Sequence, residues 1–218
     1  MLKNSFNLYI SFIFLLSITS CNDNKVKASQ AKTVNRVTTA NTKLYTKIKT
    51  GSTLNWYASH LGGVGKRNGE ILYKEASILV NDKQLINMSV TIDMDKITVK
   101  NISEDDIKDL TKHLKSNDFF NVSSYPISKF ELTKVEAIKG TNNSEITGNL
   151  EILGVSKSVT FKANIIVSDN EVYIKSELFT IDRSDWGMTY NAEGAVGVPL
   201  DYLISDDVDF TINLIILK

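Results

Sequence analysis

The chain has 218 residues, with 25 basic and 25 acidic side chains, two histidines and a single cysteine. A formal net charge of zero excludes electrostatic attraction to nucleic acid or to anionic surfaces as the basis of its function. Because Cys21 is the only cysteine, no disulfide can form within the chain, and the folded part must be stable through packing alone.

The first 20 residues have the pattern of an export signal. Lys3 precedes an apolar run from Leu8 to Leu16, which is shorter than the roughly 18 residues needed to cross a bilayer. The run ends on Ile18-Thr19-Ser20-Cys21, which resembles the lipobox of bacterial lipoproteins, where the signal is cleaved before a cysteine that then carries the lipid. We therefore expect residues 1–20 to be a signal peptide and Cys21 to be lipidated, which would anchor the protein to a bacterial membrane on the extracytoplasmic side of the cell envelope. The alternative is a buried or free cysteine after ordinary cleavage.

Residues 21–42 have no aromatic side chain and no sustained hydrophobic period. Such a composition cannot bury enough apolar surface to offset the entropy of ordering the chain. We expect this segment to be a flexible tether between the lipid and a folded domain over residues 43–218. Its basic residues could touch lipid headgroups, although a solvated linker is the simpler interpretation: Lys25, Lys27, Lys32 and Arg36.

Apolar residues recur at every second position over much of the chain after Lys43, which is the period of a strand with one buried face. Turn residues such as Gly62-Gly63 and Asn81-Asp82 separate the alternating stretches. These stretches are Leu54 to Ala58, Ile86 to Met94, Ile146 to Ile152, Val159 to Val167, Val172 to Leu178, and Val208 to Ile216.

One segment between Ser103 and Phe120 departs from this alternation. Ile107, Leu110 and Leu114 fall at helical spacing, behind a serine that can cap a helix and a first turn of acidic residues. The sequence therefore predicts one short helix in an otherwise all-β chain.

About eight antiparallel strands would leave exposed edges unless the sheet closes on itself. Closure into a barrel removes the edges, whereas a two-sheet sandwich is the alternative architecture. The long alternating runs from Gln84 to Met94 and from Asp207 to Leu217 favour the tilted strands of a barrel around a cavity.

Several segments, in order over most of residues 43–218, resemble the YceI family. Any one of them would fit an ordinary strand, but together they are specific. They are Leu54-Asn55-Trp56 with Arg67 to Ile71, Ser89 to Ile97, Leu114 to Val122, Tyr125 to Phe130, Gly148 to Lys157, and Ile181 to Gly187. Two positions depart from the family pattern, since Arg67 stands where relatives of this subtype often have histidine and Trp186 replaces phenylalanine.

This resemblance implies an extended lipocalin-like antiparallel β-barrel of about eight strands with one short helix, which holds a polyisoprenoid lipid in its lumen. From the residues alone, the favoured outcome is that the inward side chains meet and fill the barrel. The resemblance favours a cavity, and the inward apolar side chains are then the expected ligand contacts: Trp56, Met88, Val90, Ile92, Leu150, Phe161, Ile174 and Phe210.

Arg183, flanked by Asp182 and Asp185, is the most notable charged group. It could contact a phosphate headgroup of the ligand, or it could pair with a carboxylate and fix the long loop between Trp186 and Asp207.

The sequence offers little for catalysis or metal binding. His60 and His113 are the only side chains that titrate near neutral pH, and Ser59 and His60 would point to opposite faces of a strand. Two histidines do not complete a zinc site, and the acidic groups near Asp105 and Asp206 lack the spacing of a calcium loop. We therefore expect no enzyme activity, no cofactor and no metal.

The expected function is non-catalytic binding or transport of a long amphiphilic isoprenoid, with a membrane contact through the N-terminal lipid and no nucleic-acid partner. The alternative is a ligand-free barrel that serves as a scaffold or a stress-related interaction protein.

Overall fold

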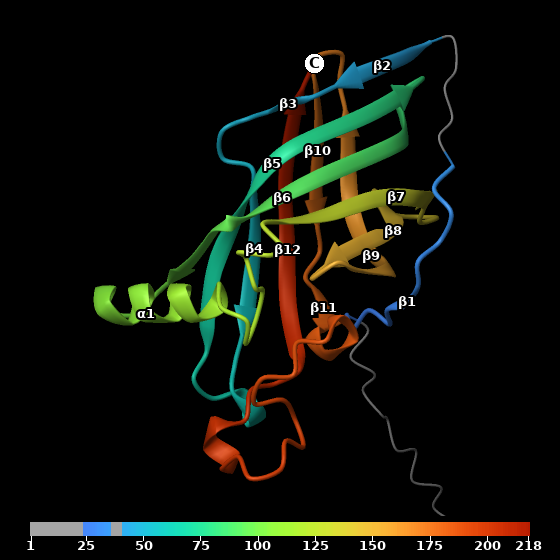
Figure 1. Cartoon of the computed structure of the whole chain (residues 1–218). Helices are drawn as coiled ribbons and strands as arrows, with labels where there is room; N and C mark the ends of the chain where they lie inside the picture. The colour runs from blue at the N-terminus through green and yellow to red at the C-terminus, as the bar shows by residue number, and fades with distance from the viewer. Residues whose placement is uncertain (1–23, 36–40) are drawn as a thin grey trace, which may run out of the picture.

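Eight antiparallel strands close into a barrel in the computed structural model, which describes residues 24–35 and 41–218 (Figure 1). The predicted signal peptide and Cys21 lie outside these residues. Around the barrel the order is β4-β5-β6-β7-β8-β9-β10-β12, and β12 pairs with β4 to complete the ring. The predicted all-β barrel is therefore confirmed, and the sandwich is excluded.

The elements have the following bounds. The barrel strands are β4 (Thr53–Ala58), β5 (Arg67–Asn81), β6 (Gln84–Lys100), β7 (Ile127–Ala137), β8 (Asn143–Ile152), β9 (Val155–Val167), β10 (Glu171–Ser176) and β12 (Asp207–Leu217). The shorter strands are β1 (Ser29–Gln30), β2 (Thr42–Tyr45), β3 (Lys47–Ile48) and β11 (Phe179–Asp182). The helix is α1 (Glu104–Leu114), and the short 3-10 turns are η1 (Leu61–Gly63), η2 (Arg183–Trp186) and η3 (Leu200–Tyr202).

The two longest strands, β5 and β6, bend around the barrel. Their pairing shifts register between Glu70 and Leu72 and again between Tyr73 and Glu75. Such bulges increase local twist, which lets long strands follow a curved wall without losing their partners. The sequence alternation predicted β6 as far as Met94, and the bulges explain why the strand continues to Lys100 with an altered pattern.

Helix α1 begins as the sequence predicts. The Ser103 hydroxyl accepts a hydrogen bond from the Asp106 N–H at 3.2 Å, and Glu104, Asp105 and Asp106 occupy the first turn. The helix lies outside the barrel beside β6 (Figure 1), with Leu114 buried against the core.

The segment 24–35 lies against the outside of the barrel, which differs from the expectation of a flexible tether over residues 21–42. Strand β1 pairs with β9 through Ser29 and Ser158, and Lys25 forms a parallel bridge with Thr180 on β11. Strand β11 pairs with β12 but not with β9, so a gap opens in the wall between β9 and β11. The segment covers this gap because the two unpaired strand edges offer hydrogen-bond partners that composition alone cannot reveal.

Candidate functional site

A cavity of about 80 Å³ lies in the barrel lumen. Nearly all of its lining consists of hydrocarbon side chains, and the two lining residues with a polar side-chain atom are Tyr73 and Ser128. The lining residues are Leu54, Ile71, Tyr73, Met88, Val90, Ile92, Met94, Phe120, Ser128, Phe130, Leu150, Ile152, Val159, Phe161, Ile174, Phe179, Ile181, Phe210, Ile212 and Leu214. A site of this chemistry binds by burying apolar surface and offers little directional recognition.

The structure brings together most of the side chains predicted to contact a ligand. Those on the central cavity are Met88, Val90, Ile92, Leu150, Phe161, Ile174 and Phe210. Trp56 lies elsewhere, on a second, lower cavity of about 70 Å³. The lining residues that the two cavities share are Ile71, Phe120, Ile152, Ile181 and Phe210. The two cavities therefore follow one another along the barrel.

Several lining residues were not among the predicted contacts. Phe130 on β7 and Ile71 on β5 obey the same inward alternation as their neighbours, so the period-2 pattern could have identified them. The alternation along β10 does not predict that Phe179 and Ile181 on β11 face inward. The chain leaves β10 after Ser176 and resumes pairing with β12 only at Phe179, and this break resets which residues face inward.

Four phenylalanines form a row along one wall of the lumen. The ring centroids of Phe130 and Phe161 are 5.7 Å apart, those of Phe161 and Phe179 are 4.8 Å apart with an interplanar angle of 16°, and those of Phe179 and Phe210 are 6.0 Å apart. Ring pairs in such geometries stabilise one another beyond their area burial, which favours this arrangement of the wall.

Tyr73 provides a hydroxyl group at the lumen wall. It donates a hydrogen bond to the carbonyl oxygen of Thr53 at 3.2 Å, and burial raises the pKa of Tyr73 far above its ordinary value. The phenol therefore stays neutral at physiological pH and adds no charge to the lumen.

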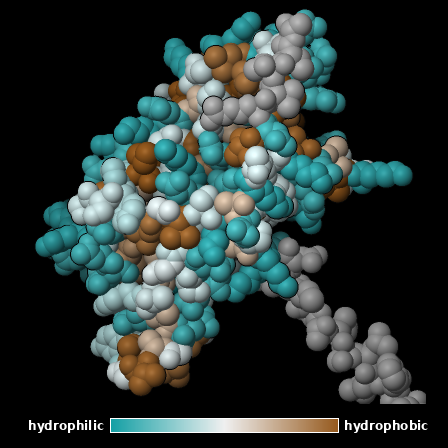
Figure 2. Space-filling model, turned by 45° about the vertical axis from the view of Figure 1, so that its right-hand side comes forward, coloured by the Kyte–Doolittle hydropathy of each residue, from teal (hydrophilic) through white to brown (hydrophobic). Residues whose placement is uncertain are grey.

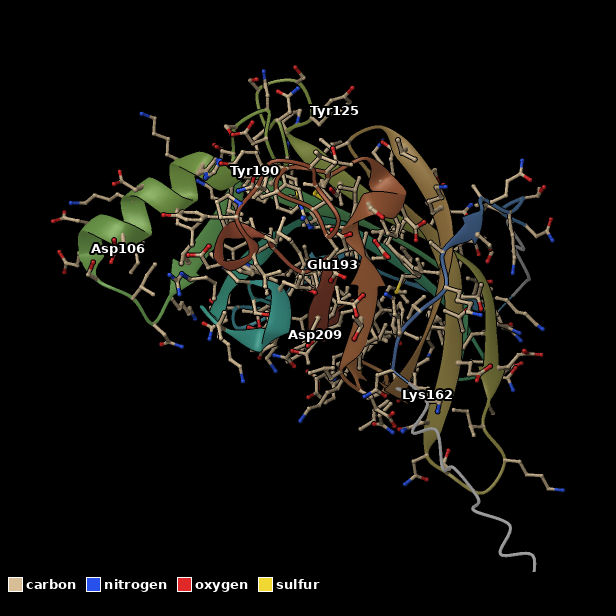
Figure 3. All side chains as sticks on the ribbon, turned by 90° about the horizontal axis from the view of Figure 1, so that it is seen from below. Asp106, Tyr125, Lys162, Tyr190, Glu193 and Asp209 are labelled. Carbon is tan, nitrogen blue, oxygen red and sulfur yellow. The ribbon has the colours of Figure 1, made fainter. Side chains whose placement is uncertain are left out.

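The loop between η2 and β12 closes the lower end of the barrel. Figure 3, a view from below, shows this loop crossing the barrel end, with Tyr190 and Glu193 on it. Met188 and Ile204 from the loop line the lower cavity. The Glu193 carboxylate accepts hydrogen bonds from the Ser205 hydroxyl at 3.1 Å and the Asp206 N–H at 3.2 Å, which hold the loop together.

Arg183 holds this loop in place. It is 2% exposed, and its guanidinium donates to the carbonyl oxygens of Ser205 at 3.1 Å, Met188 at 3.1 Å and Ile204 at 3.3 Å. It also pairs with Asp206 at 3.1 Å. Of the two roles considered for Arg183, these contacts correspond to fixing the loop.

Burial shifts the pKa values of both Arg183 and Asp206. It lowers the pKa of Arg183, against the opposing attraction of Asp206, and it raises the pKa of Asp206, against the attraction of Arg183. In this poorly solvated site each charge is the largest electrostatic compensation of the other.

The two histidines lie outside the lumen, on an open pocket between α1 and the β4–β5 connection. The Nδ1 atom of His60 is 2.7 Å from the Asp201 carbonyl oxygen, and Nε2 of His113 is 2.9 Å from the Asp118 carboxylate. Within residues 24–35 and 41–218, no hydrogen-bonded chain links Ser59, His60 and a carboxylate, and no group of three potential metal ligands is found. The same part of the chain contains no helix long and apolar enough to cross a membrane.

The family model of the YceI-like domain matches residues 45–216, which is most of the chain. The chain belongs to the YceI-like domain family. A UPF0312 protein of Pseudomonas aeruginosa is 44% identical over 79 residues, covering 36% of this chain and 37% of the relative. A UPF0312 protein of Shewanella denitrificans is 47% identical over 55 residues, covering 25% and 28%. The matched segments thus span 37% and 28% of the length of these curated relatives.

Solved structures share the fold of this YceI-like chain at low sequence identity. BcnA of Burkholderia cenocepacia superposes with a TM-score of 0.57 at 16% identity, covering 75% of this chain and 95% of BcnA. A YceI protein of Campylobacter jejuni gives a TM-score of 0.50 at 22% identity, covering 68% and 84%. At such identities the likeness establishes the barrel and not the ligand.

Proposed function

We propose that this YceI-like protein is a non-catalytic, extracytoplasmic lipid-binding protein that holds or transports a long amphiphilic isoprenoid in its lumen. The observation that carries this proposal is the pair of successive apolar cavities inside the closed barrel. A hydrocarbon chain needs no directional partner, and a lining made mainly of methyl, methylene and ring groups offers few.

The energetics suit a carrier. Each methylene removed from water contributes about 0.8 kcal/mol, so an isoprenoid is strongly driven out of the aqueous phase. A membrane-resident lipid, however, starts in surroundings as apolar as the lumen, and its net transfer free energy into the barrel is small. A small difference permits both uptake and release, which a carrier requires.

The lumen dimensions limit what fits without rearrangement. A volume of about 80 Å³ holds about five water-sized molecules, comparable with one five-carbon isoprene unit, and the lower cavity adds a similar space. A longer chain requires lining residues to move. Met88 and Met94 on β6 can do so because unbranched thioether side chains adopt many rotamers at low cost.

Organic extraction of the protein purified from its native host, followed by mass spectrometry, tests the proposal. A prenyl lipid at near-stoichiometric amount in repeated preparations is the expected result. Preparations that repeatedly contain no lipid would refute lipid binding.

A matched pair of variants tests whether a bound lipid occupies the lumen. Val90 lines the cavity, whereas Thr91, its neighbour on β6, does not. Val90→Phe is expected to reduce the co-purified lipid several-fold because the added ring occupies the cavity, and Thr91→Phe is expected to leave it unchanged. Circular dichroism and thermal unfolding of both variants separate loss of binding from loss of folding. Equal lipid content in the two variants would place the lipid outside the lumen.

We further propose that Cys21 carries a lipid that anchors the protein to a bacterial membrane on its extracytoplasmic side, following removal of residues 1–20 as a signal peptide. Support comes from the lipobox-like sequence before Cys21. Cys21→Ser is expected to abolish lipid attachment, detected as the loss of the acyl mass on the N-terminal peptide. An unchanged N-terminal mass would contradict the proposal.

A ligand-free barrel that acts as a scaffold or a stress-related interaction protein is the second candidate. The observation in its favour is the small volume of the central cavity, about 80 Å³, beside which the rings of Phe161 and Phe179 stack. The extraction experiment decides between the two candidates.

A further inference from the structure

Two loops at the lower end of the barrel are joined into a single tip, formed by residues 59–66 and 191–206 (Figure 1). The Leu61 N–H donates to the Leu203 carbonyl oxygen at 2.8 Å, and the Ser205 N–H donates to the Ser59 carbonyl oxygen at 3.0 Å. His60 adds its contact with Asp201 at 2.7 Å. The tip is therefore a defined structure held by backbone hydrogen bonds.

This tip carries the four most exposed large apolar side chains of the described residues: Val196 at 100%, Leu200 at 72%, Tyr202 at 60% and Val64 at 59%. Figure 2 shows hydrophobic residues gathered at the lower end of the molecule, with hydrophilic residues above them. Single exposed apolar residues are ordinary on protein surfaces, but a cluster on one protruding end is typical of an interaction surface.

The N-terminal segment is attached at the same end of the barrel. The Asn24 carbonyl oxygen accepts from the Thr180 N–H at 2.9 Å, and the Val26 N–H donates to the Thr180 carbonyl oxygen at 2.7 Å. Lys25 pairs with Asp182 at 3.6 Å and also with Asp207. These contacts fix the first described residues beside β11, toward the end of the barrel that carries the tip (Figure 1).

The position of Asn24 limits where an anchored barrel can lie. Cys21 precedes Asn24 by three positions, and three residues span at most about 11 Å when fully extended. A lipid on Cys21 would therefore hold this end of the barrel next to the bilayer, with no long spacer between them. The tip would then face the membrane.

The tip has no excess of positive charge. Lys66 is its only Lys or Arg residue, against the carboxylates of Glu193, Asp201 and Asp206, and Asp206 pairs with Arg183. Attraction to anionic headgroups would therefore contribute little, and burial of the apolar side chains would dominate any contact.

We propose that the tip docks on the surface of the bilayer that holds the anchor, with Val196, Leu200 and Tyr202 entering the interfacial region. Tyrosine suits that depth because its ring is apolar and its hydroxyl stays hydrated. The inference rests on the proposed lipid attachment at Cys21, but it is independent of what the lumen binds.

The test uses the full chain, produced in a bacterial host and reconstituted in phosphatidylcholine vesicles that carry a nitroxide-labelled lipid. Cys21 is the only cysteine, so once it is lipidated a cysteine introduced by Val196→Cys is the only free thiol and can be labelled with a fluorophore. Lys218→Cys, at the opposite end of the barrel, is the matched control (Figure 1). We expect the lipid quencher to reduce the fluorescence at position 196 at least two-fold and to leave that at position 218 within about a tenth of its original value.

A second variant tests the apolar contact itself. Leu200→Ser combined with Tyr202→Ser should restore most of the fluorescence at position 196, and both side chains are exposed enough for the fold to be retained, as circular dichroism would verify. Equal quenching at positions 196 and 218, or a position 196 that is shielded from water but not quenched by lipid, would overturn the proposal. Quenching that requires phosphatidylglycerol would also overturn it, because the contact would then be electrostatic.

Mass spectrometry of the N-terminal peptide separates a failure of the proposed lipid attachment at Cys21 from a failure of the proposed docking of the tip. A lipidated Cys21 with no quenching at position 196 refutes docking alone. An unmodified Cys21 refutes the proposed anchor and removes the basis for docking.

Discussion

The side-chain amide of Asn149 pairs with the backbone of Lys32 as a neighbouring strand would. Its Oδ1 atom accepts from the Lys32 N–H at 2.8 Å, and its Nδ2 donates to the Lys32 carbonyl oxygen at 2.6 Å. These two residues are 117 positions apart, and the pair fastens the N-terminal segment to β8. Asn149 thereby helps to hold that segment over the gap between β9 and β11.

Asn149→Ala is expected to lower the free energy of unfolding by about 1–2 kcal/mol, because two hydrogen bonds of half-buried groups are lost. Hydrogen exchange at Ser29 and Lys32 should accelerate more than in the barrel strands. Asn164→Ala is the control, since it removes one side-chain bond to the Asn142 carbonyl oxygen without touching the segment. Unchanged exchange at Lys32 would show that the pair does not hold the segment.

Trp186→Phe is expected to destabilise the barrel by about 1–3 kcal/mol. The indole Nε1 donates to the Leu150 carbonyl oxygen at 3.1 Å, and Trp186 is fully buried, so phenylalanine would leave that carbonyl without its donor. Urea unfolding followed by circular dichroism measures the change. A midpoint equal to that of the unmodified protein would mean that phenylalanine repacks without loss.

Gly69→Ala should destabilise the fold by more than about 3 kcal/mol. A Cβ atom at this position would lie 1.8 Å from the Thr98 carbonyl oxygen and 2.7 Å from Nε1 of Trp56, which itself donates to that oxygen. The control is Gly51→Ala, where a Cβ meets nothing within 4 Å and only the left-handed backbone, with φ of +91°, opposes the change. That control should cost about 1 kcal/mol, and similar losses for both variants would contradict the steric argument.

Arg183→Lys is expected to lower the free energy of unfolding by about 3 kcal/mol, because an ammonium group cannot reach the three carbonyl oxygens and Asp206 together. Arg67→Lys is the matched control, since Arg67 donates only to the carbonyl oxygen of its neighbour Lys66. Its effect should stay within about 0.5 kcal/mol. Urea unfolding of both variants provides the comparison, and equal losses would argue against the role of Arg183 in closing the barrel.

The lowered pKa of Asp182 predicts that the free energy of unfolding depends on pH. Burial alone would raise its pKa, but hydrogen bonds from the Ser184 hydroxyl and N–H, together with Lys25, lower the pKa below the ordinary value of 3.8. Because the folded state binds this proton less tightly than the unfolded state, Asp182 stabilises the fold above about pH 4, and the contribution is lost as the pH falls through the lowered pKa.

Unfolding of the unmodified protein and of Asp182→Asn at two pH values measures this contribution. We expect a difference of about 0.5–1 kcal/mol at pH 6, small because Asp182 is partly exposed, and a difference near zero at pH 2.5. A difference in free energy of unfolding that is larger at pH 2.5 than at pH 6 would contradict a lowered pKa of Asp182.

The sequence alone determined the local part of this structure. The helix after Ser103 and the alternating strands on either side of it depend on contacts between near neighbours, and their periods of 3.6 and 2 are visible along the chain. The inward positions Met88, Val90 and Ile92 follow from the same alternation, which is why most predicted lumen residues do line the cavity.

Tertiary structure decided the rest. The cavity depends on how far apart the opposed walls of the barrel lie. Arg183 donates to loop carbonyl oxygens up to 22 positions away, and the segment 24–35 is held by Asn149, which lies 117 positions from Lys32. Pairing also resumes in a new register after the break between β10 and β11. The composition of residues 24–35 is that of a solvated linker, and it packs because two strand edges elsewhere in the chain lack partners. Such complementarity is a property of the closed barrel, and no local pattern of residues encodes it.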